Sequence, residues 1–341
     1  AVRRRGLALC CAALAVASAM HPLMVAYGFG CVLVLYCIAS SSRRLRRWGT
    51  PGLCVAALGI AAAMQALAPP ESATYVRASM TRSYWFPGSW HWYEQFGLAA
   101  PLLILAIAGL GKRCRGDAAR VALARMAVIC GAVAVVVATL FAQAGLSTHS
   151  VARLQPLRIF QVVYVLMILT VGAAVAERVL QRHPLRWITA FVLLAGIMVF
   201  VQRETFPNSA HLELPSRAPQ NQWEQAFVWI SKNTPKDALF ALDSHYISIP
   251  GEDAQSFRAI AERSALPDYS KDGGEASITP ELTAAWMAGE TAQTGLSTAS
   301  DAQRIAALKP LSVTWVVLGR DSKTDFACAY QNQAVKVCRL P

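Results

Sequence analysis

Acidic residues are nearly missing from the first 202 positions of this chain, and charged residues are scarce throughout. Only 15% of its 341 residues are charged, whereas soluble domains average about 25%. The first 202 residues hold four acidic side chains, which are Glu71, Glu94, Asp117 and Glu177. This shortage excludes an ordinary soluble protein and directs attention to the membrane.

The motifs that mark several enzyme and transporter classes are also missing. The sequence contains no phosphate-binding loop, no G-x-G-x-x-G, no G-x-S-x-G and no H-E-x-x-H. The lack of a phosphate-binding loop argues against an ATP-driven pump. The apolar segments carry almost no acids or bases, which argues against an ion-coupled transporter. No C-x-x-C pair exists, so a zinc ribbon is excluded, and we predict no metal site from the residues alone.

The positive charge of the chain is concentrated in its apolar part. The net charge is +12 overall. Residues 1–202 hold 19 basic and four acidic residues, a net of +15, while the remainder holds 13 basic and 16 acidic residues, a net of −3. Basic residues between apolar segments are typical of membrane proteins, so we expect a lipid bilayer as partner and no nucleic acid.

Seven apolar segments approach the length of about 20 residues that a helix needs to cross a bilayer. The run from Gly6 to Ser40 is too long for one span, and His21-Pro22 interrupts it, because proline disfavours helix in the preceding residue. We therefore predict a helical hairpin there. The expected spans of this transmembrane domain, residues 1–202, are 6–21, 22–40, 51–68, 96–111, 121–144, 159–177 and 187–202.

Basic residues in the connections predict the orientation of these spans. Fourteen lie on one side, in clusters such as Arg43–Arg47, and four on the other. By the positive-inside rule the first side is cytoplasmic. We thus expect a multi-pass protein of the bacterial inner membrane, with a cytoplasmic N-terminus and an extracytoplasmic C-terminal domain.

The N-terminus admits a second interpretation. Arg3–Arg5, the apolar run Leu7–Ala17 and the small residues Ala17-Ser18-Ala19 resemble a secretory signal peptide. Cleavage after residue 19 would leave six spans and the same C-terminal orientation. The chain begins with alanine, which is explained either by removal of the initiator methionine or by the loss of upstream spans.

The outer connection 69–95 is rich in aromatic residues. Trp85, Trp90 and Trp92 lie there beside Tyr84, Phe86 and Tyr93. Tryptophan and tyrosine favour the membrane interface, so an interfacial segment is one interpretation. The other is a platform for a sugar ring or a lipid head group.

Four arginines are the only basic residues on the outer side of the membrane domain: Arg77, Arg82, Arg153 and Arg158. The guanidinium group donates two parallel hydrogen bonds to phosphate. These side chains are either interfacial anchors or ligands for the phosphate of a lipid.

From Arg203 onwards the composition is that of a soluble domain. Residues 203–221 form a proline-containing linker, and 222–341 alternate helical patterns with short apolar strands, which predicts a small extracytoplasmic α/β domain. We expect helices at 222–233, 256–263, 280–292 and 302–308, and strands at 238–242, 313–318, 326–330 and 334–339.

The stretch 243–274 is the most polar part of this domain, and it begins where a strand ends, a usual place for ligand sites. Asp243, His245, Arg258, Arg263 and Lys271 are its candidate ligand-binding residues. A solvated loop with surface ion pairs is the alternative.

Cys328 and Cys338 lie on the two arms of the terminal hairpin. An oxidising compartment permits a disulfide between them, and we predict this bridge.

Several segments together resemble a known architecture. The His-Pro turn, the aromatic loop Tyr84–Glu94, the LQPLR segment Leu154–Arg158 and WISKNTPKDALF at Trp229–Phe240 are similar to bacterial multi-spanning proteins of the GT-C glycosyltransferase type. With SFRAIAERS and NQAVKVCRL, the chain resembles the C-terminal part of an uncharacterised bacterial family with this architecture.

The resemblance implies a sugar donor linked to polyprenyl phosphate and an acidic residue in the first outer loop as base or metal ligand. A divalent metal is implied on this ground alone. The first outer connection, His21-Pro22, carries no acid. Glu71 and Glu94 are the only acids in the outer membrane loops, and Glu94 is the preferred catalytic candidate because of its aromatic neighbours.

Two functions follow from these observations. The first is transfer of a sugar from a polyprenyl-phosphate donor on the extracytoplasmic face. The second is a non-catalytic envelope protein whose external α/β domain binds a glycan or a protein partner. Neither donor nor acceptor is specified by the sequence.

Overall fold

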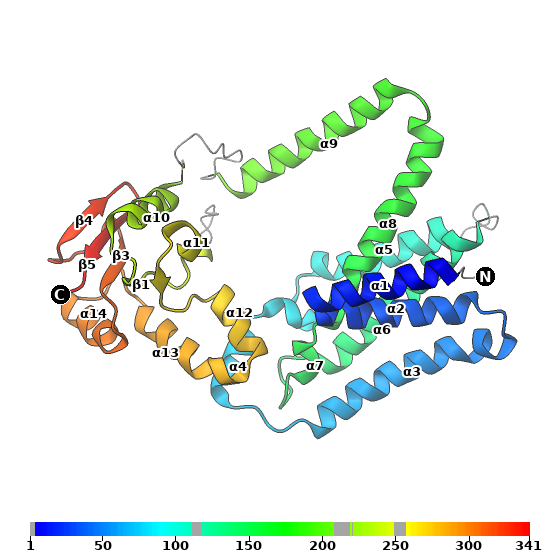
Figure 1. Cartoon of the computed structure of the whole chain (residues 1–341), viewed down its shortest axis with the longest axis horizontal. Coiled ribbons are helices and arrows are strands. Elements are labelled where there is room, and N and C mark those ends of the chain that lie inside the picture. Colours follow the sequence, from blue (N-terminus) through cyan, green and yellow to red (C-terminus); the bar gives the residue numbers. More distant parts are fainter. Residues whose placement is uncertain (1–3, 111–116, 208–218, 220, 249–256) are drawn as a thin grey trace. The chain divides into compact units, whose positions relative to one another are not determined.

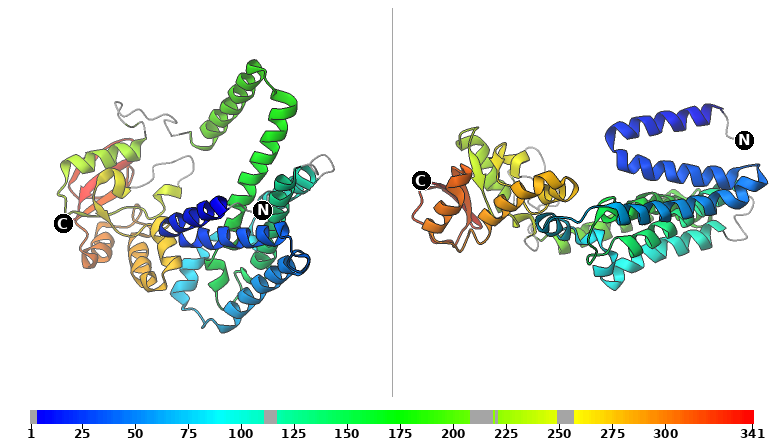
Figure 2. Two further views of the ribbon diagram at one scale, coloured as in Figure 1. Left: turned by 45° about the vertical axis from the view of Figure 1, so that its right-hand side comes forward. Right: turned by 90° about the horizontal axis from the view of Figure 1, so that it is seen from below.

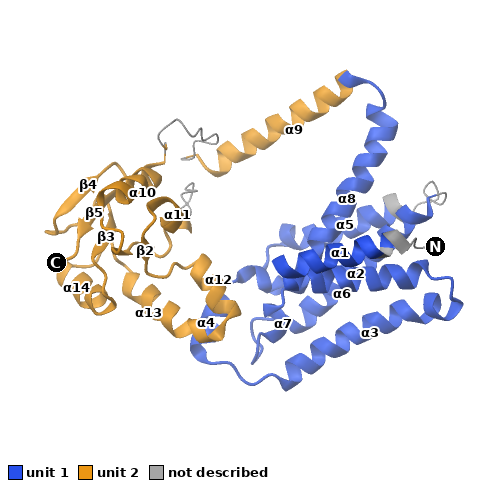
Figure 3. Ribbon diagram, in the orientation of Figure 1, with its two compact units in different colours: residues 1–184 blue, residues 185–341 orange. Residues whose placement is uncertain are grey.

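The computed structural model describes residues 4–110, 117–207, 219, 221–248 and 257–341 (Figure 1). The chain divides into two compact units, residues 1–184 and 185–341 (Figure 3). The boundary lies at the start of the last apolar helix. Arg3, Lys112, Arg113 and Arg115, which contributed to the predicted orientation, and most of the predicted linker 203–221 lie outside the described residues.

The first unit is helical. Figure 2 shows α1 and α2 as an antiparallel pair, joined at His21. The longer helices are α1 Arg4–Met20, α2 Pro22–Ala39, α3 Arg43–Leu67, α5 Trp92–Leu110, α6 Ala118–Phe141 and α8 Phe160–Val175. Short elements occupy the connections: α4 Ala73–Met80, η1 Ser83–Trp85, η2 Pro87–Ser89, α7 Ser150–Arg153, η4 Pro156–Ile159 and the π-helical turn η5 Ala176–Leu180.

The expected apolar helical bundle is confirmed in its coarse form. Within the described residues, five helical segments are long and apolar enough to cross a membrane. They are α2, α3, α6, the segment Ser150–Leu180 and α9 Pro184–Thr205. Two shorter apolar helices, Ala8–Met20 and Trp92–Ile107, coincide with the other two predicted spans. The count of seven spans and their orientation stay predictions.

Side-chain caps explain where several of these helices begin. His21 caps α2, with Pro22 in the first turn, and its Nδ1 lies 3.4 Å from the backbone nitrogen of Met24. Ser42 and Ser72 accept backbone N–H bonds at the starts of α3 and α4. Such caps satisfy backbone donors that have no partner inside the helix. The turn between α1 and α2 therefore lies at His21-Pro22, as the sequence predicted, and His21 caps the helix that follows.

Helix α6 is the most buried of the apolar helices in the first unit. Alanines and Gly131 on α6 permit close packing, and a Cβ added at Gly131 would lie 2.6 Å from Leu102 Cδ2 on α5. Val163 and Phe160 on α8, with Cys31 and Val34 on α2, complete the same core. Thus α6 forms the centre around which the neighbouring helices lie.

The second unit contains α9 and an α/β fold built on a five-stranded sheet of order β2-β1-β3-β5-β4. β1 is parallel to β2 and β3, whereas β5 is antiparallel to β3 and β4. The strands are β1 Leu239–Ala241, β2 Ser264–Ala265, β3 Trp315–Gly319, β4 Cys328–Gln331 and β5 Val335–Arg339. The helices are α10 Gln222–Asn233, α11 Phe257–Ala261, α12 Lys271–Ile278, α13 Thr283–Gln293 and α14 Asp301–Leu308, with the 3₁₀ turns η6 Tyr246–Ser248, η7 Pro280–Leu282 and η8 Lys309–Leu311.

Alternating residues of the strands give this sheet two cores. On one face Val317 packs with Phe227 of α10 and Phe257 of α11. On the other face Val316 and Leu318 pack with Leu308 of α14. Successive side chains of a strand point to opposite faces, so one short apolar strand serves both layers.

Most elements of the α/β domain follow the sequence prediction, but two in the polar stretch do not. Residues 264–265 form β2 and residues 271–278 form α12. β2 is only two residues long, and α12 contains Gly273-Gly274, which lower helix propensity. Asp268 Oδ1 accepts the backbone N–H of Lys271, which starts the helix. β2 is too short, and α12 too rich in glycine, for the sequence pattern to predict them.

The hairpin β4–β5 carries the disulfide. Cys328 and Cys338 are paired across the two strands and joined by an S–S bond of 2.04 Å. This is the pairing that the sequence predicted.

Asp301 couples the stability of the α/β domain to pH. Its carboxylate accepts hydrogen bonds from Arg304 Nη1 at 2.6 Å, Thr324 Oγ1 at 2.7 Å and the backbone nitrogen of Asp325 at 2.7 Å. Burial alone would raise the pKa of the Asp301 carboxyl, but these donors hold the pKa below its usual value. The stabilisation is therefore present above the ordinary pKa of about 3.9 and is lost as pH falls through the lower folded-state pKa.

We expect Asp301→Asn to lower the thermal unfolding temperature near neutral pH. The difference from wild type should shrink as the pH falls below about 4, because the wild-type carboxylate is then protonated as well. Thermal unfolding of both proteins across this range measures the effect. A difference that stays constant down to about pH 2 would contradict the assignment.

Candidate functional site

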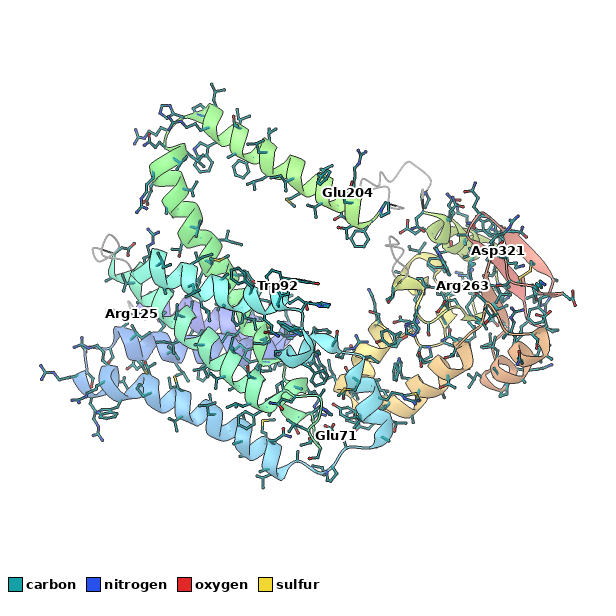
Figure 4. The ribbon with its side chains drawn as sticks, turned by 180° about the vertical axis from the view of Figure 1, so that it is seen from behind. Glu71, Trp92, Arg125, Glu204, Arg263 and Asp321 are labelled. Atoms are coloured by element: carbon teal, nitrogen blue, oxygen red, sulfur yellow. A yellow bond between two sulfur atoms is a disulfide. The ribbon has the colours of Figure 1, made fainter. Side chains whose placement is uncertain are left out.

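Polar side chains gather at one end of the bundle in the first unit. This end, here called the histidine end, consists of His21 and the connections 68–91 and 142–159. Figure 4 shows Glu71 and Trp92 toward this end and Arg125 toward the other. The opposite end carries Arg43–Arg47, Arg120, Arg178 and Arg182 in the helix starts and turns. The division of charge that predicted two membrane faces therefore corresponds to the two ends of one bundle.

Glu71 and His149 form a buried pair at the histidine end. His149 Nδ1 lies 2.6 Å from Glu71 Oε2, and the side chains are 1% and 13% exposed. Glu71 Oε1 also accepts hydrogen bonds from the backbone nitrogen of His149 at 2.8 Å and from Thr148 Oγ1 at 3.3 Å. The pair joins the chain before α4 to the chain before α7.

Two further contacts complete the surroundings of His149. Its Nε2 lies 3.3 Å from the carbonyl oxygen of Ala144, while its Nδ1 lies against the carboxylate of Glu71. Phe86 packs edge-on against the His149 ring, with ring centroids 5.5 Å apart. The imidazole is therefore enclosed by two oxygen acceptors and an aromatic ring.

Tyr75 and Arg153 extend the cluster. Tyr75 is 3% exposed. Burial raises the pKa of its hydroxyl, while Arg153 partly offsets this effect and Glu71 adds to it. The phenol therefore stays protonated and able to donate. A carboxylate, a phenol and a guanidinium lie close together here, although they come from separate segments of the chain.

Arg158 lies in η4, directly before α8, and faces His21. Its Nη1 is 3.0 Å from His21 Nε2, and its Nε donates to Gln155 Oε1. Gln155 has a left-handed backbone, with φ of 52°, and forms the sharp turn between α7 and η4. The hydroxyl of Tyr27 donates to the carbonyl of Leu154 in the same turn. These contacts tie the first hairpin to the start of α8.

An apolar groove of about 450 Å³ runs from this turn along the bundle. It lies between α2, α3 and α6. Tyr27, Val151 and Leu154 line it at the histidine end, and Val34, Leu53 and Cys54 line it further along. Since these helices are apolar enough for the membrane, a hydrocarbon chain is the ligand that suits such a lining.

The four predicted phosphate-binding arginines occupy different environments. Arg153 belongs to the Glu71 cluster and Arg158 to the His21 contact. Arg82 is buried, and its Nε donates to Thr81 Oγ1. Arg77 is exposed on α4. Arg153 and Arg158 are the members of this set whose chain neighbours Leu154 and Ile159 line the groove.

Glu94, the preferred catalytic candidate, is exposed and performs a local task. Its Oε2 accepts the backbone N–H of His91 at 2.7 Å, the contact of a helix start. Glu71, the other acid of the outer connections, is only 13% exposed and pairs with His149. Trp92 and Tyr93, the neighbours of Glu94, are exposed as well.

The predicted aromatic platform separates into two kinds of residue. Trp85 is 3% exposed and packs with Phe86, Ala138, Ala142 and Ala152. Trp92 is 78% exposed, and Trp90 Nε1 donates to the carbonyl of Ser83 at 3.2 Å. Trp85 thus supports the histidine end from within, while Trp92 points outward.

In the α/β domain, Asp243 and His245 follow β1. His245 Nε2 lies 3.1 Å from Glu290 Oε1, and its ring lies 4.2 Å from that of Tyr269. Asp243 Oδ1 accepts the backbone N–H of His245 at 2.9 Å. An exposed histidine, a tyrosine and a carboxylate therefore meet at the carboxyl edge of the parallel strands.

Two of the three basic candidates of this domain, Arg263 and Arg258, form hydrogen bonds or ion pairs that stabilise the fold. Arg263 is buried, and its Nη2 donates to the carbonyls of Thr234 at 2.6 Å and Ser231 at 2.8 Å, at the end of α10. Arg258 forms a bidentate pair with Asp272 at 2.7 and 2.9 Å, which raises the pKa of the guanidinium. Lys271 is exposed at the start of α12.

The sequence predicted no site role for His149 or Tyr75, and it predicted His21 only as part of the hairpin turn. All three lie in connections between apolar spans, and this placement was the one signal that could have identified them. Among the described residues, no three histidine, cysteine, aspartate or glutamate side chains gather in a way that could hold a metal.

Comparison of the chain with protein-family models and with curated proteins gives no match.

Proposed function

We propose that this chain is an integral membrane protein of the GT-C type that transfers a sugar from a polyprenyl-phosphate donor on the extracytoplasmic face of the bacterial inner membrane. The histidine end would face outward, as the distribution of basic residues predicts. The α/β domain would lie on the same side. The acceptor would approach from the outer aqueous phase or from the outer leaflet.

One observation carries this proposal. An apolar groove of about 450 Å³ ends at the turn that carries Arg158, and the largely buried carboxylate of Glu71 lies in another connection at the same end. A lipid-linked sugar has an apolar chain, a phosphate and a sugar in this order. The groove, Arg158 with Arg153, and Glu71 supply a complementary group for each part.

Arg158 and Glu71 would have different roles in the transfer. An acceptor hydroxyl attacks the anomeric carbon, and the bond from that carbon to the phosphate oxygen breaks with its electron pair on the oxygen. Arg158 would stabilise the negative charge that develops on the phosphate. Glu71, coupled to His149, would take the proton of the acceptor hydroxyl. No step in this scheme requires a metal ion.

Arg158→Gln tests the phosphate role. We expect sugar transfer from labelled polyprenyl-linked donors in membranes to fall by about tenfold or more, since a hydrogen bond to a charged group is lost. Arg77→Gln is the matched control because it removes the same charge at an exposed position of α4. Equal losses in both variants, or undiminished transfer in Arg158→Gln, would remove the proposed role.

A second function has its own support. The group of His245, Tyr269 and Glu290 at the strand ends combines an aromatic ring with hydrogen-bonding groups, a combination that binds sugars. A non-catalytic envelope protein that binds a glycan through this domain is therefore the alternative. Glycan binding that depends on Tyr269, in a chain without transfer activity, would favour it.

A further inference from the structure

We propose that four arginines at the start of α3 form a binding surface for the head groups of anionic phospholipids. The surface, here called the arginine cluster, consists of Arg43, Arg44, Arg46 and Arg47. It lies at the end of the bundle opposite the histidine end. The proposal depends neither on sugar transfer nor on the orientation of the chain, because it concerns the lipid that surrounds the protein.

The length of α3 places the arginine cluster at the depth of the lipid phosphates. Helix α3 has 25 residues and begins at Arg43, so that 20 residues remain once the five of Arg43–Arg47 are subtracted. At a rise of 1.5 Å per residue, such a segment spans about 30 Å, the thickness of the hydrocarbon core. Trp48, the first residue of this segment, is 61% exposed, and tryptophan favours the membrane interface. The guanidinium groups that precede it therefore lie in the head-group layer.

Helical geometry directs the four guanidinium groups away from α2. At about 100° per residue, the first and last arginines of the cluster share one face of α3, the two middle ones lie on either side of it, and Leu45 lies opposite. All four arginines are exposed, whereas Leu45 is half-buried. The face of Leu45 also packs closely, since a Cβ added at Gly49 would lie 2.7 Å from Cys37 Sγ on α2. This packing fixes the start of α3 and leaves the arginines on its outer side.

The arginine cluster has no acidic partner in the described part of the chain. None of the ion pairs formed by the described residues involves these four side chains. No acidic residue precedes Glu71 in the sequence, and Glu71 lies at the histidine end. Asp117, at the same end as the cluster, caps α6 by accepting the backbone N–H of Arg120 at 3.1 Å. The positive charge of the cluster is therefore available to a partner outside the chain.

The arrangement of the arginines is electrostatically unfavourable within the chain itself. The N-terminus of a helix carries a partial positive charge, and the first turn of α3 contains no acidic residue. Arg43 and Arg47 are four positions apart on the helix, a spacing at which like charges repel each other. One internal contact partly offsets this repulsion, because the guanidinium of Arg47 lies over the ring of Trp48 at 5.4 Å. Negative charge from the membrane would relieve the rest.

The chemistry of the cluster fits an anionic phosphodiester in the bilayer. Guanidinium groups donate paired hydrogen bonds to phosphate oxygens. Clusters of four or more basic residues beside a membrane helix attract anionic head groups. A zwitterionic head group carries an ammonium group that cancels the charge of its phosphate, so it offers less to four arginines. We therefore expect a lipid with net negative charge, of which phosphatidylglycerol is the simplest probe.

The test titrates the purified full chain in a neutral detergent with phosphatidylglycerol or with phosphatidylcholine of the same acyl chains. Native mass spectrometry measures the bound lipid. We expect wild type to bind phosphatidylglycerol at least about tenfold more tightly than phosphatidylcholine, and this preference to shrink at about 0.5 M salt. Arg43→Gln/Arg47→Gln should weaken phosphatidylglycerol binding by about tenfold or more, since each basic residue at a charged surface contributes about fivefold.

Arg178→Gln/Arg182→Gln is the matched control. These two arginines are exposed, lie at the same end of the first unit and are also four positions apart. This variant should bind phosphatidylglycerol much as wild type does, and thermal unfolding verifies that both double variants are folded. Equal losses in the two variants would show a general attraction of positive charge and would overturn the site.

Two other results would also overturn the proposal. Equal affinity of wild type for phosphatidylglycerol and phosphatidylcholine would show that the arginines do not select anionic lipid. Glycerophosphoglycerol, the same head group without acyl chains, should bind far more weakly than the lipid. Equal binding of this soluble compound would show that the position of the cluster in the head-group layer contributes nothing.

Discussion

Replacing Glu71 by glutamine should lower sugar transfer by about 10²- to 10⁴-fold, the usual contribution of a general base. The amide has the size of the carboxyl group and retains an oxygen that accepts from the His149 backbone nitrogen, which lies 2.8 Å away. It cannot take a proton from an acceptor hydroxyl. The measurement is the initial rate of transfer from a labelled polyprenyl-linked donor in membranes.

Glu94→Gln is the matched control, because Glu94 is exposed and its carboxylate contacts the start of its own helix. It should retain transfer close to wild type. Thermal unfolding of Glu71→Gln verifies that the bundle keeps its structure. Loss of transfer in Glu94→Gln with full activity in Glu71→Gln would reverse the assignment and restore the candidate that the sequence favoured.

Replacing Arg304 by leucine should destabilise the α/β domain by about 3–5 kcal/mol, the cost of breaking a buried charge pair. Arg304 is 1% exposed. It donates to Asp301, which begins the same helix, and to the carbonyls of Leu296 at 2.9 Å and Lys323 at 2.9 Å. Leucine fills part of the space and satisfies none of these acceptors.

Hydrogen exchange of the full chain measures this effect locally. Amides of β3 should exchange faster in Arg304→Leu, while those of α6 should be unaffected, because the two elements belong to different units. Arg339→Leu, an exposed position on β5, is the control and should alter stability by less than about 0.5 kcal/mol. Unaltered protection of β3 in Arg304→Leu would show that the buried network contributes little.

The membrane helices could be predicted because their signals are local. Apolar length, His21-Pro22 and the basic clusters each act within one segment, and α2 begins at Pro22 as expected. The terminal hairpin of the α/β domain could be predicted for a similar reason, since Cys328 and Cys338 lie symmetrically about one turn. β2 and α12 were missed because their stability comes from tertiary contacts rather than from the sequence pattern.

The site was only partly predictable because it is assembled from distant segments. Glu71 and His149 are 78 positions apart, and Arg158 and His21 are 137 positions apart. Composition indicated arginines and acids on these connections, but it could not show that Glu71 pairs with His149 while Glu94 is exposed.

The most direct test of the account is where a lipid-linked donor binds. A polyprenyl-phosphate sugar that carries a photoreactive group in its chain can be cross-linked to the full protein in membranes, and the adducts mapped by mass spectrometry. We predict adducts on the groove-lining parts of α2, α3 and α6, at Val34, Leu53 and Ala134 among others, and competition by unlabelled farnesyl phosphodiester. Adducts concentrated on α9, which exposes apolar side chains on every face, with no competition, would contradict it.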